Sequence, residues 1–263
     1  MAHWKDLNII EPSGVKTSVP SYDTPTSGNN ISYKADGKTI YCKIGPSSYK
    51  NATKCVADAN RNRILLKAIY PLSTVEFKNP GNFSWKVPDD VSKIKVIVVA
   101  AGGGGACTQN GYSAAIGTAG GASSIGSTRC TGGGGGRAKP HAHNSVYGTV
   151  GAAGSPGGSP GALGADNENV AGGAGYKYNG VTYGGGGGAY GAPNSGGRWD
   201  TEASGGSGGR IIGQVMSVHS GDTLNIVVGK GGTGVCYNDR SDAYARNGGN
   251  GLVVIQYGGS IEG

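Results

Sequence analysis

The stretches Gly102–Gly105, Gly132–Gly136 and Gly184–Gly188 decide how this chain can fold. Four or five consecutive glycines cannot hold an α-helix or an ordinary strand, because glycine loses the most backbone entropy on ordering and has no side chain to pack. Two structures remain open for residues 101–209. One is a flexible Gly/Ser segment, and the other is a bundle of polyglycine-II helices, packed so closely that only glycine fits between them.

The segments between the glycine runs favour the ordered bundle. Residues 107–112, 137–143 and 198–202 carry cysteine, tyrosine, tryptophan and charged side chains. Flexible spacers contain few aromatic residues or cysteines, whereas loops that turn the chain back into a bundle can display them. A polyglycine-II helix makes no internal hydrogen bonds, so neighbouring segments must satisfy its backbone. The repeated runs supply those neighbours, and we expect a polyglycine-II helix sandwich.

Composition divides the chain into two parts. Only five of the 54 glycines precede residue 101, and residues 1–100 carry 14 Lys and Arg against 8 Asp and Glu. The remaining residues carry 9 against 8, so the basic balance belongs to the first part. Nucleic acid binds through charge neutralisation and counterion release, for which a nearly neutral glycine-rich region is a poor surface. We therefore expect no nucleic-acid partner.

Alternating apolar residues predict strands on both sides of the glycine block. These strands are Val75–Phe77, Phe83–Val87, Val91–Val99, Arg210–Val218, Asp222–Val228 and Gly251–Tyr257. In the third of them Ile94, Val96 and Val98 share one face. We expect a β frame, residues 75–100 and 210–258, that supplies the hydrophobic core for a mainly β domain spanning 75–263. Residues 229–250 are predicted to form a long turn.

Residues 1–74 are predicted to form a small N-terminal attachment domain of α+β or all-β class. Strand patterns cover Thr39–Ile44 and Arg63–Tyr70, and a short helix is expected within residues 48–60. The first 30 residues lack a core of their own, yet they contain Trp4, Leu7, Ile9 and Ile10. Such apolar residues either dock onto another protein or fold back onto the first domain, and both interpretations stay open.

The N-terminus has no secretory signal pattern, and no stretch approaches the length of about 18 apolar residues that spans a membrane. We therefore expect synthesis in a cytoplasm and no membrane insertion. The five cysteines are odd in number, so they cannot all pair within one chain. Free, partly buried thiols are expected, with a Cys42–Cys55 bridge formed after release from the cell as the alternative.

No motif for catalysis is evident. Val228–Gly234 resembles a phosphate loop, but Lys230 is followed by glycine and no helical pattern comes next. His141 and His143 supply two of the ligands that a metal site needs, and two do not define a site. No catalytic triad or carboxylate pair stands out. We expect no enzyme activity, no cofactor and no metal.

Tyrosines among small polar residues dominate the connecting segments, and this is the composition of evolved binding loops. Each tyrosine can alternatively cover a glycine helix where no other apolar surface exists. The predicted aromatic contacts are Tyr112, Tyr147, Tyr176, Tyr178, Tyr190, Trp199 and Tyr237. Arg137, Lys139 and Arg198 are predicted to meet acidic sugars or phosphates.

The block Phe83–Gly105 joins an aromatic strand, a Val-Pro turn, a β-strand and a glycine run. It resembles the opening of glycine-rich domains at tailed-bacteriophage tail-fibre tips, and Gly208–Val215, Ser220–Gly232 and Gly248–Tyr257 are similar to the closing motifs of that family. The overall plan also resembles the separate distal adhesins of T-even-type phages. In the first 72 residues no sequence of that family is recognised.

The resemblance implies a polyglycine-II sandwich whose variable loops bind a host outer-membrane protein or lipopolysaccharide. It also implies a location at the tip of the virion's tail fibre, with the N-terminal part mounted on a shaft protein. The chain itself has no heptads from which to build a shaft. A structural coat or matrix protein and an ice-binding-like stack of glycine helices are the alternatives.

Overall fold

The structure, a computed structural model, describes residues 72–88, 91–109, 111–140, 148–165, 168–191, 200–238, 240–258 and 261, the side chain of Ala165 excepted. Before residue 72 it describes the backbone of seven strands. The described chain is mainly β, as the sequence predicts. It divides into two compact units, of which the first contains β1 to β7 and the second contains Thr74–Val87 and Lys93–Gln256. No helix among the described residues is long and apolar enough to span a bilayer.

The first unit is built from antiparallel strand pairs. Its strands are β1 (Trp4–Ile10) with β2 (Lys16–Tyr22), β3 (Ile31–Asp36) with β4 (Thr39–Ile44) and β5 (Lys50–Asn51), and β6 (Lys54–Ala57) with β7 (Ile64–Lys67). The helix expected within residues 48–60 is wrong, because β5 and β6 take their hydrogen bonds from neighbouring strands instead. Trp4, Leu7, Ile9 and Ile10 all belong to β1, and their docking role stays a prediction.

The frame of the second unit consists of two four-stranded sheets. One has the order β23-β10-β27-β8 and the other the order β14-β13-β24-β9. Their bounds are β8 (Ser73–Phe77), β9 (Gly81–Lys86), β10 (Lys93–Val99), β13 (Ser123–Ile125), β14 (Thr128–Cys130), β23 (Arg210–Ser217), β24 (Thr223–Val228) and β27 (Leu252–Tyr257). All six strands predicted around the glycine block are confirmed within two residues at each end.

The hydrophobic core lies in this frame. Ile94, Val96 and Val98 are fully buried, which confirms that they share the inner face of β10, and Ile125 and Ile226 of the other sheet are buried as well. A second cluster joins Val99, Tyr183, Leu252 and Val254. Large aliphatic side chains are therefore concentrated where strands, rather than glycine runs, form the backbone.

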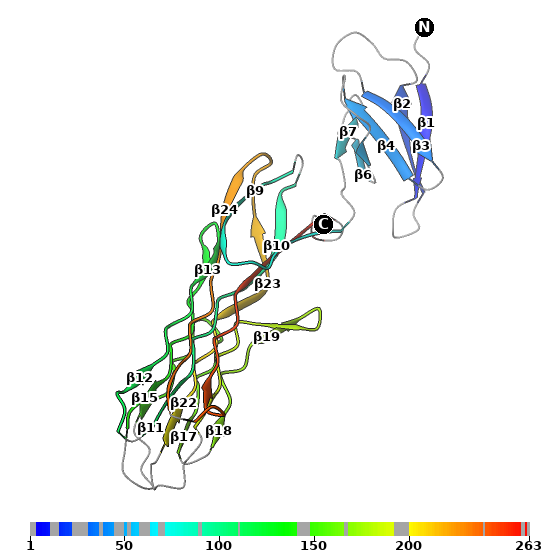
Figure 1. Cartoon of the computed structure of the whole chain (residues 1–263). Helices are drawn as coiled ribbons and strands as arrows, with labels where there is room; N and C mark the ends of the chain where they lie inside the picture. The colour runs from blue at the N-terminus through cyan, green and yellow to red at the C-terminus, as the bar shows by residue number, and fades with distance from the viewer. Residues whose placement is uncertain are drawn as a thin grey trace. The chain divides into compact units, whose positions relative to one another are not determined.

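Three smaller sheets lie at the opposite end of the second unit (Figure 1). Their strands are β11 (Ala106–Gln109), β12 (Ala115–Ile116), β15 (Arg137–Ala138), β16 (Gly148–Thr149), β17 (Leu163–Ala165), β18 (Asn169–Val170), β21 (Ala189–Tyr190), β22 (Asp200–Ala203), β25 (Val235–Tyr237) and β26 (Tyr244–Ala245). They pair in the orders β17-β22-β11-β25, β12-β15-β16 and β18-β21-β26. We call this part of the second unit the loop end.

Extended segments connect the frame with the loop end and run side by side (Figure 1). We call them the glycine bundle; they comprise residues 100–105, 117–122, 131–136, 171–175, 184–188, 204–209, 229–234 and 246–251, together with residues 150–162, which leave β16, turn at residues 155–157 and return to β17. The predicted long turn at 229–250 is therefore wrong, because its two glycine stretches belong to the bundle and β25 and β26 lie between them. The turn interpretation missed that these stretches have bonding partners elsewhere in the chain.

The hydrogen bonds of residues 100–105 repeat every three residues. The N–H groups of Ala100 and Gly103 donate to Gly209 and Gly206, those of Ala101 and Gly104 to Gly121 and Thr118, and those of Gly102 and Gly105 to Gly249 and Arg246. The carbonyl groups of the same segment accept from three further segments, which contain Gly133, Gly187 and Gly232. Six neighbours thus surround this segment and satisfy its backbone.

Close approach explains why glycine is needed at the centre of the bundle. A β-carbon added at Gly103 would collide with the backbone carbonyl of Gly134. Neither backbone can retreat without losing hydrogen bonds to its other neighbours. The bundle is therefore held by backbone groups, at a spacing that side chains would prevent.

Candidate functional site

The pairing of short strands brings the described ends of five connecting segments to the loop end. These segments are residues 110–114, 139–147, 166–168, 191–199 and 238–243. Gln109 pairs with Asp200, Ala138 with both Ala115 and Gly148, and Tyr190 with both Asn169 and Tyr244. Each of these pairs joins residues that border a connecting segment. The register of the sheets, rather than any one motif, thus brings together the ends of segments that are spread over residues 110–243 of the sequence.

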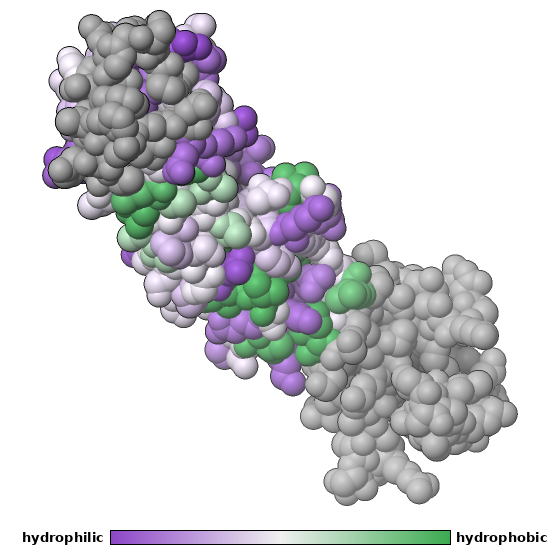
Figure 2. Space-filling model, turned by 90° about the horizontal axis from the view of Figure 1, so that it is seen from below, coloured by the Kyte–Doolittle hydropathy of each residue, from purple (hydrophilic) through white to green (hydrophobic). Residues whose placement is uncertain are grey.

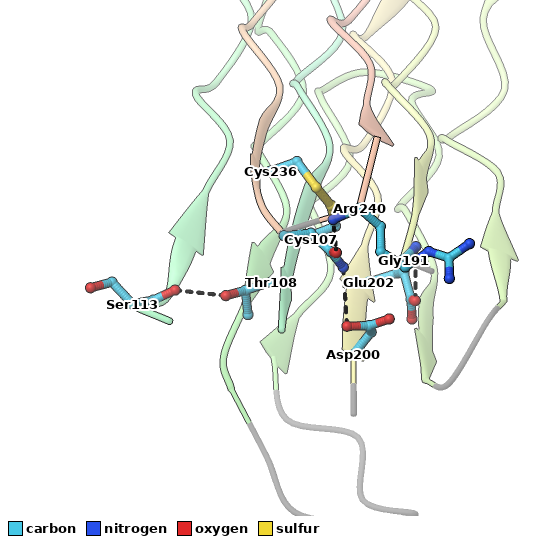
Figure 3. Close-up of a disulfide and its surroundings, with 9 residues drawn as sticks. Cys107, Thr108, Ser113, Gly191, Asp200, Glu202, Cys236 and Arg240 are labelled. Atoms are coloured by element: carbon cyan, nitrogen blue, oxygen red, sulfur yellow. Dashed lines mark hydrogen bonds between the residues drawn. A yellow bond between two sulfur atoms is a disulfide. The ribbon is translucent and has the colours of Figure 1, made fainter. Parts of the chain in front are cut away.

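A disulfide between Cys107 and Cys236 joins β11 and β25, the strands that lead into segments 110–114 and 238–243 (Figure 3). The two cysteines are directly paired in the parallel strands β11 and β25, with their Cα atoms 4.5 Å apart. The expectation of free thiols is therefore wrong for this pair, because the parallel register that joins them cannot be deduced from cysteine spacing. Cys130 is buried and not disulfide-bonded, whereas the side chains of Cys42 and Cys55 lie outside the described residues.

A carboxylate pair that the sequence analysis missed lies beside the disulfide (Figure 3). Asp200 and Glu202 lie two residues apart on β22, so they share one face of the strand, and both are fully buried. Glu202 accepts a hydrogen bond from the N–H of Gly191 at 2.9 Å, and Asp200 accepts one from the amide of Asn238 at 3.1 Å. The pair therefore holds the bases of segments 191–199 and 238–243. The spacing Asp-Thr-Glu is a signal for a shared strand face, but the sequence analysis interprets residues 198–202 as a loop between glycine runs.

The environment of Glu202 disfavours its charged form. Burial, and next the negative charge of Asp200, raise the pKa of the Glu202 carboxyl to about 8. Its Oε2 atom has no hydrogen-bond partner among the described residues. At neutral pH the carboxyl is therefore mostly protonated and holds the loop base as a neutral acceptor. Among the described residues, no group of three or more potential metal ligands converges here.

Four of the predicted contact residues lie exposed at the loop end. Tyr112 follows β11 and Tyr237 ends β25, with 39% and 45% of their surface accessible. Arg137 on β15 and Lys139 immediately after it are also exposed. Tyr147, Arg198 and Trp199 lie outside the described residues, as do His141 and His143. The structure thus gathers aromatic and basic residues from three separate parts of the sequence.

Tyr190 also lies at the loop end, where it packs against another tyrosine. The rings of Tyr190 and Tyr244 have centroids 5.7 Å apart and planes inclined at 35°. The Arg246 guanidinium lies 4.8 Å from the centre of the Tyr244 ring, and the Tyr244 hydroxyl donates to Asn169 at 3.3 Å. Tyr244, Arg246 and Asn169 were not among the predicted contacts. Their association depends on β18, β21 and β26 becoming neighbours.

Tyr176 and Tyr178 are not brought to this surface. They lie on β19 (Tyr176–Tyr178), which forms a hairpin with β20 (Val181–Tyr183) through a turn with positive φ at Asn179 and Gly180. Both tyrosines pack against the frame cluster, and the Tyr178 hydroxyl donates to Glu76 at 2.6 Å. That hydrogen bond raises the pKa of Tyr178 to about 12. The structure thus places these two predicted contacts on the frame, apart from the loop tyrosines with which the sequence analysis groups them.

No protein-family model matches the chain, and no curated protein sequence matches it.

Proposed function

We propose that this chain is a bacteriophage tail-fibre tip adhesin, which binds a host outer-membrane protein or lipopolysaccharide through the loop end. The observation that carries the proposal is that the described ends of five connecting segments meet at one end of the glycine bundle. Tyr112, Tyr237, Arg137 and Lys139 are exposed there. Exposed aromatic and basic side chains on a common surface suit recognition of a partner that presents both apolar and anionic groups. Tyr147, Tyr190, Arg198 and Trp199 complete the proposed contacts.

The glycine bundle is proposed to be a polyglycine-II sandwich. Support comes from the hydrogen bonds of residues 100–105, which return to the same neighbour every third residue, as a helix with three residues per turn requires. Surrounding backbones restrain each segment from several sides. Loops attached to such a support begin preorganised and lose little entropy on binding, so modest surfaces suffice for affinity. Several fibres that engage one cell would multiply that affinity.

Residues 1–74 are proposed to mount the chain on the shaft protein of the fibre, with Trp4, Leu7, Ile9 and Ile10 at the contact. The protein would be made in the host cytoplasm and act on the released virion. No catalysis is proposed. The carboxylates of Asp200 and Glu202 are fully buried. Each accepts a hydrogen bond from a residue at the start of a connecting segment, Asn238 and Gly191 respectively, and this favours a structural role for the pair.

Binding of the purified full chain to whole Gram-negative cells tests the function. We expect saturable binding, lost in host mutants that lack either one outer-membrane protein or the outer sugars of lipopolysaccharide. A Tyr112→Ala, Tyr237→Ala double variant should bind at least about tenfold more weakly with an unchanged unfolding midpoint. Absence of binding across a broad cell panel would overturn the adhesin proposal and favour a structural coat or matrix protein instead.

A further inference from the structure

The three-stranded sheet β18-β21-β26 has two different faces. Val170, Ala189 and Ala245 are paired across it, and their row packs against Cys107 and Cys236 of the disulfide. The next row is Asn169, Tyr190 and Tyr244, again paired across all three strands. Because side chains alternate between the faces of a sheet, this second row lies on the face opposite the disulfide. We call that face the tyrosine face.

The tyrosine face joins aromatic rings directly to polar groups. Tyr190 and Tyr244 pack ring against ring, and the Tyr244 hydroxyl reaches across the row to Asn169. Arg246, two residues beyond Tyr244, places its guanidinium over the Tyr244 ring and is itself exposed. Asn169 is exposed as well, and both tyrosines are half-buried. The rings are thus held in place while amide, hydroxyl and guanidinium groups border them.

A pyranose ring has the complementary chemistry. Its C–H groups form an apolar face that packs on an aromatic ring, and its hydroxyls at the rim exchange hydrogen bonds with amide and guanidinium groups. A carboxylate or phosphate on the sugar would pair with arginine. We propose that the tyrosine face is a saccharide-binding subsite for a surface glycan of the host. This inference rests on the proposed adhesin function and commits it to lipopolysaccharide sugars rather than a protein receptor.

The distribution of exposed apolar side chains favours a glycan over a protein. The centre of a protein–protein interface is depleted of charge and rich in apolar contacts. Large aliphatic residues exposed in the described part of the second unit include Ile116 on β12 and Ile212, Val215 and Val227 on frame strands, but none of the exposed ones belongs to β18, β21 or β26. On the face seen in Figure 2, apolar residues form separate green patches among polar ones. On the tyrosine face, by contrast, the Tyr244 ring contacts the Arg246 guanidinium and its hydroxyl contacts Asn169.

The opposite face of the sheet explains how the subsite stays in shape. Val170 and Ala189 are buried against Cys107, whose disulfide connects β11 with β25. The rings therefore stand on a covalently cross-linked layer of small side chains. When the side chains that contact a ligand are already fixed before binding, less conformational entropy is lost on binding. Such preorganisation matters for sugars, because their hydroxyls must leave water and find well-placed partners.

The test uses the full chain and lipid-free core oligosaccharide released from lipopolysaccharide by mild acid. Binding is followed by saturation-transfer NMR and by competition with binding to whole cells. We expect the oligosaccharide to compete, and Tyr190→Ala and Arg246→Gln each to weaken its binding about tenfold. Tyr244→Phe keeps the ring and should cost less. Arg129→Gln, an exposed arginine on β14 of the frame, is the matched control and should bind as the unchanged chain does.

The outcomes separate this inference from the proposed function. Cell binding that is intact, insensitive to the oligosaccharide and unaffected by Tyr190→Ala and Arg246→Gln would overturn the saccharide subsite while the adhesin proposal stands, with a protein receptor. The same conclusion would follow if binding were lost in host mutants that lack one outer-membrane protein and kept in mutants with altered lipopolysaccharide. Absence of binding both to cells and to oligosaccharide would overturn both. Unfolding midpoints of all variants, measured in parallel, ensure that a loss of binding is not a loss of fold.

Discussion

The frame and the glycine bundle of the second unit are stabilised in opposite ways. In the frame, Ile94, Val96, Ile125 and Ile226 remove apolar surface from water, which is the usual source of folding free energy. In the bundle the side chains are absent at the close contacts, and backbone hydrogen bonds to several neighbours hold each segment. The comparison shows that one continuous chain can be ordered by burial in one region and by backbone satisfaction in the next.

The largest effect is expected from a methyl group in the bundle. Gly103→Ala should lower the free energy of unfolding by roughly 3 kcal/mol or more, because the carbonyl of Gly134 occupies the space that the methyl needs. Urea unfolding measures this change. Gly185→Ala is the matched control, since its added β-carbon would meet no atom nearer than 3.7 Å. Small, equal effects of the two variants would contradict the close packing of the bundle.

Loss of the disulfide is expected to distinguish the loop end from the frame. Replacing Cys107 and Cys236 with Ala should cost about 2–4 kcal/mol, because the bond closes a long loop in the unfolded chain. Hydrogen exchange should become faster in β11 and β25 and stay slow in β10 and β24. Cys130→Ala is the control in the frame, where burial raises the pKa of the Cys130 thiol to about 11 and keeps it unreactive. Faster exchange throughout the unit would show instead that the two regions unfold together.

The pH dependence of stability is expected to differ in sign between the two regions. Glu202 has a pKa of about 8 in the folded chain, above its ordinary 4.5, so the folded state keeps a proton that the unfolded state releases in this window. Stability should therefore fall as pH rises from about 4.5 to 8, by up to tenfold in the folding constant per pH unit. Glu202→Gln keeps an acceptor for the Gly191 N–H, and its stability relative to the unchanged chain should increase as pH rises.

Glu76 in the frame supplies the contrast. Hydrogen bonds from Lys78 and Tyr178 lower the pKa of the Glu76 carboxyl, so its contribution is present above the ordinary carboxyl range and is lost on acidification. Denaturant unfolding of Glu202→Gln and Glu76→Gln at pH 3, 5 and 8.5 compares the two: the difference between Glu76→Gln and the unchanged chain should shrink from pH 5 to pH 3, and that of Glu202→Gln should change from pH 5 to pH 8.5. A constant difference between Glu202→Gln and the unchanged chain at both pH values would contradict the raised pKa of Glu202.

The smallest effect is expected from Tyr178→Phe. This change removes the hydroxyl that donates to Glu76 and leaves the ring on the frame cluster, so it should cost about 1 kcal/mol in thermal or urea unfolding. Binding to host cells should not change, because the hairpin β19–β20 packs on the frame. A loss of cell binding without a loss of stability would return Tyr178 to the binding surface.

The sequence by itself determined the β class and the strands of the frame, because alternation of apolar residues such as Ile94, Val96 and Val98 is a local signal. It also indicated that the glycine runs exclude helices and ordinary strands, since that exclusion is a property of glycine itself. The tertiary structure decided what those runs bond to, which is why residues 229–234 and 246–251 were misjudged as a turn.

The tertiary structure alone also decided the pairs at the loop end. Cys107 and Cys236 are 129 residues apart, and Tyr190, Tyr244 and Asn169 become neighbours through strands of two residues each. Such short strands carry no periodicity that a sequence can display, and their partners are set by the order in which the bundle segments pack. Composition therefore identified the kinds of side chain that the loops present, whereas only the register of distant segments determined which of them meet.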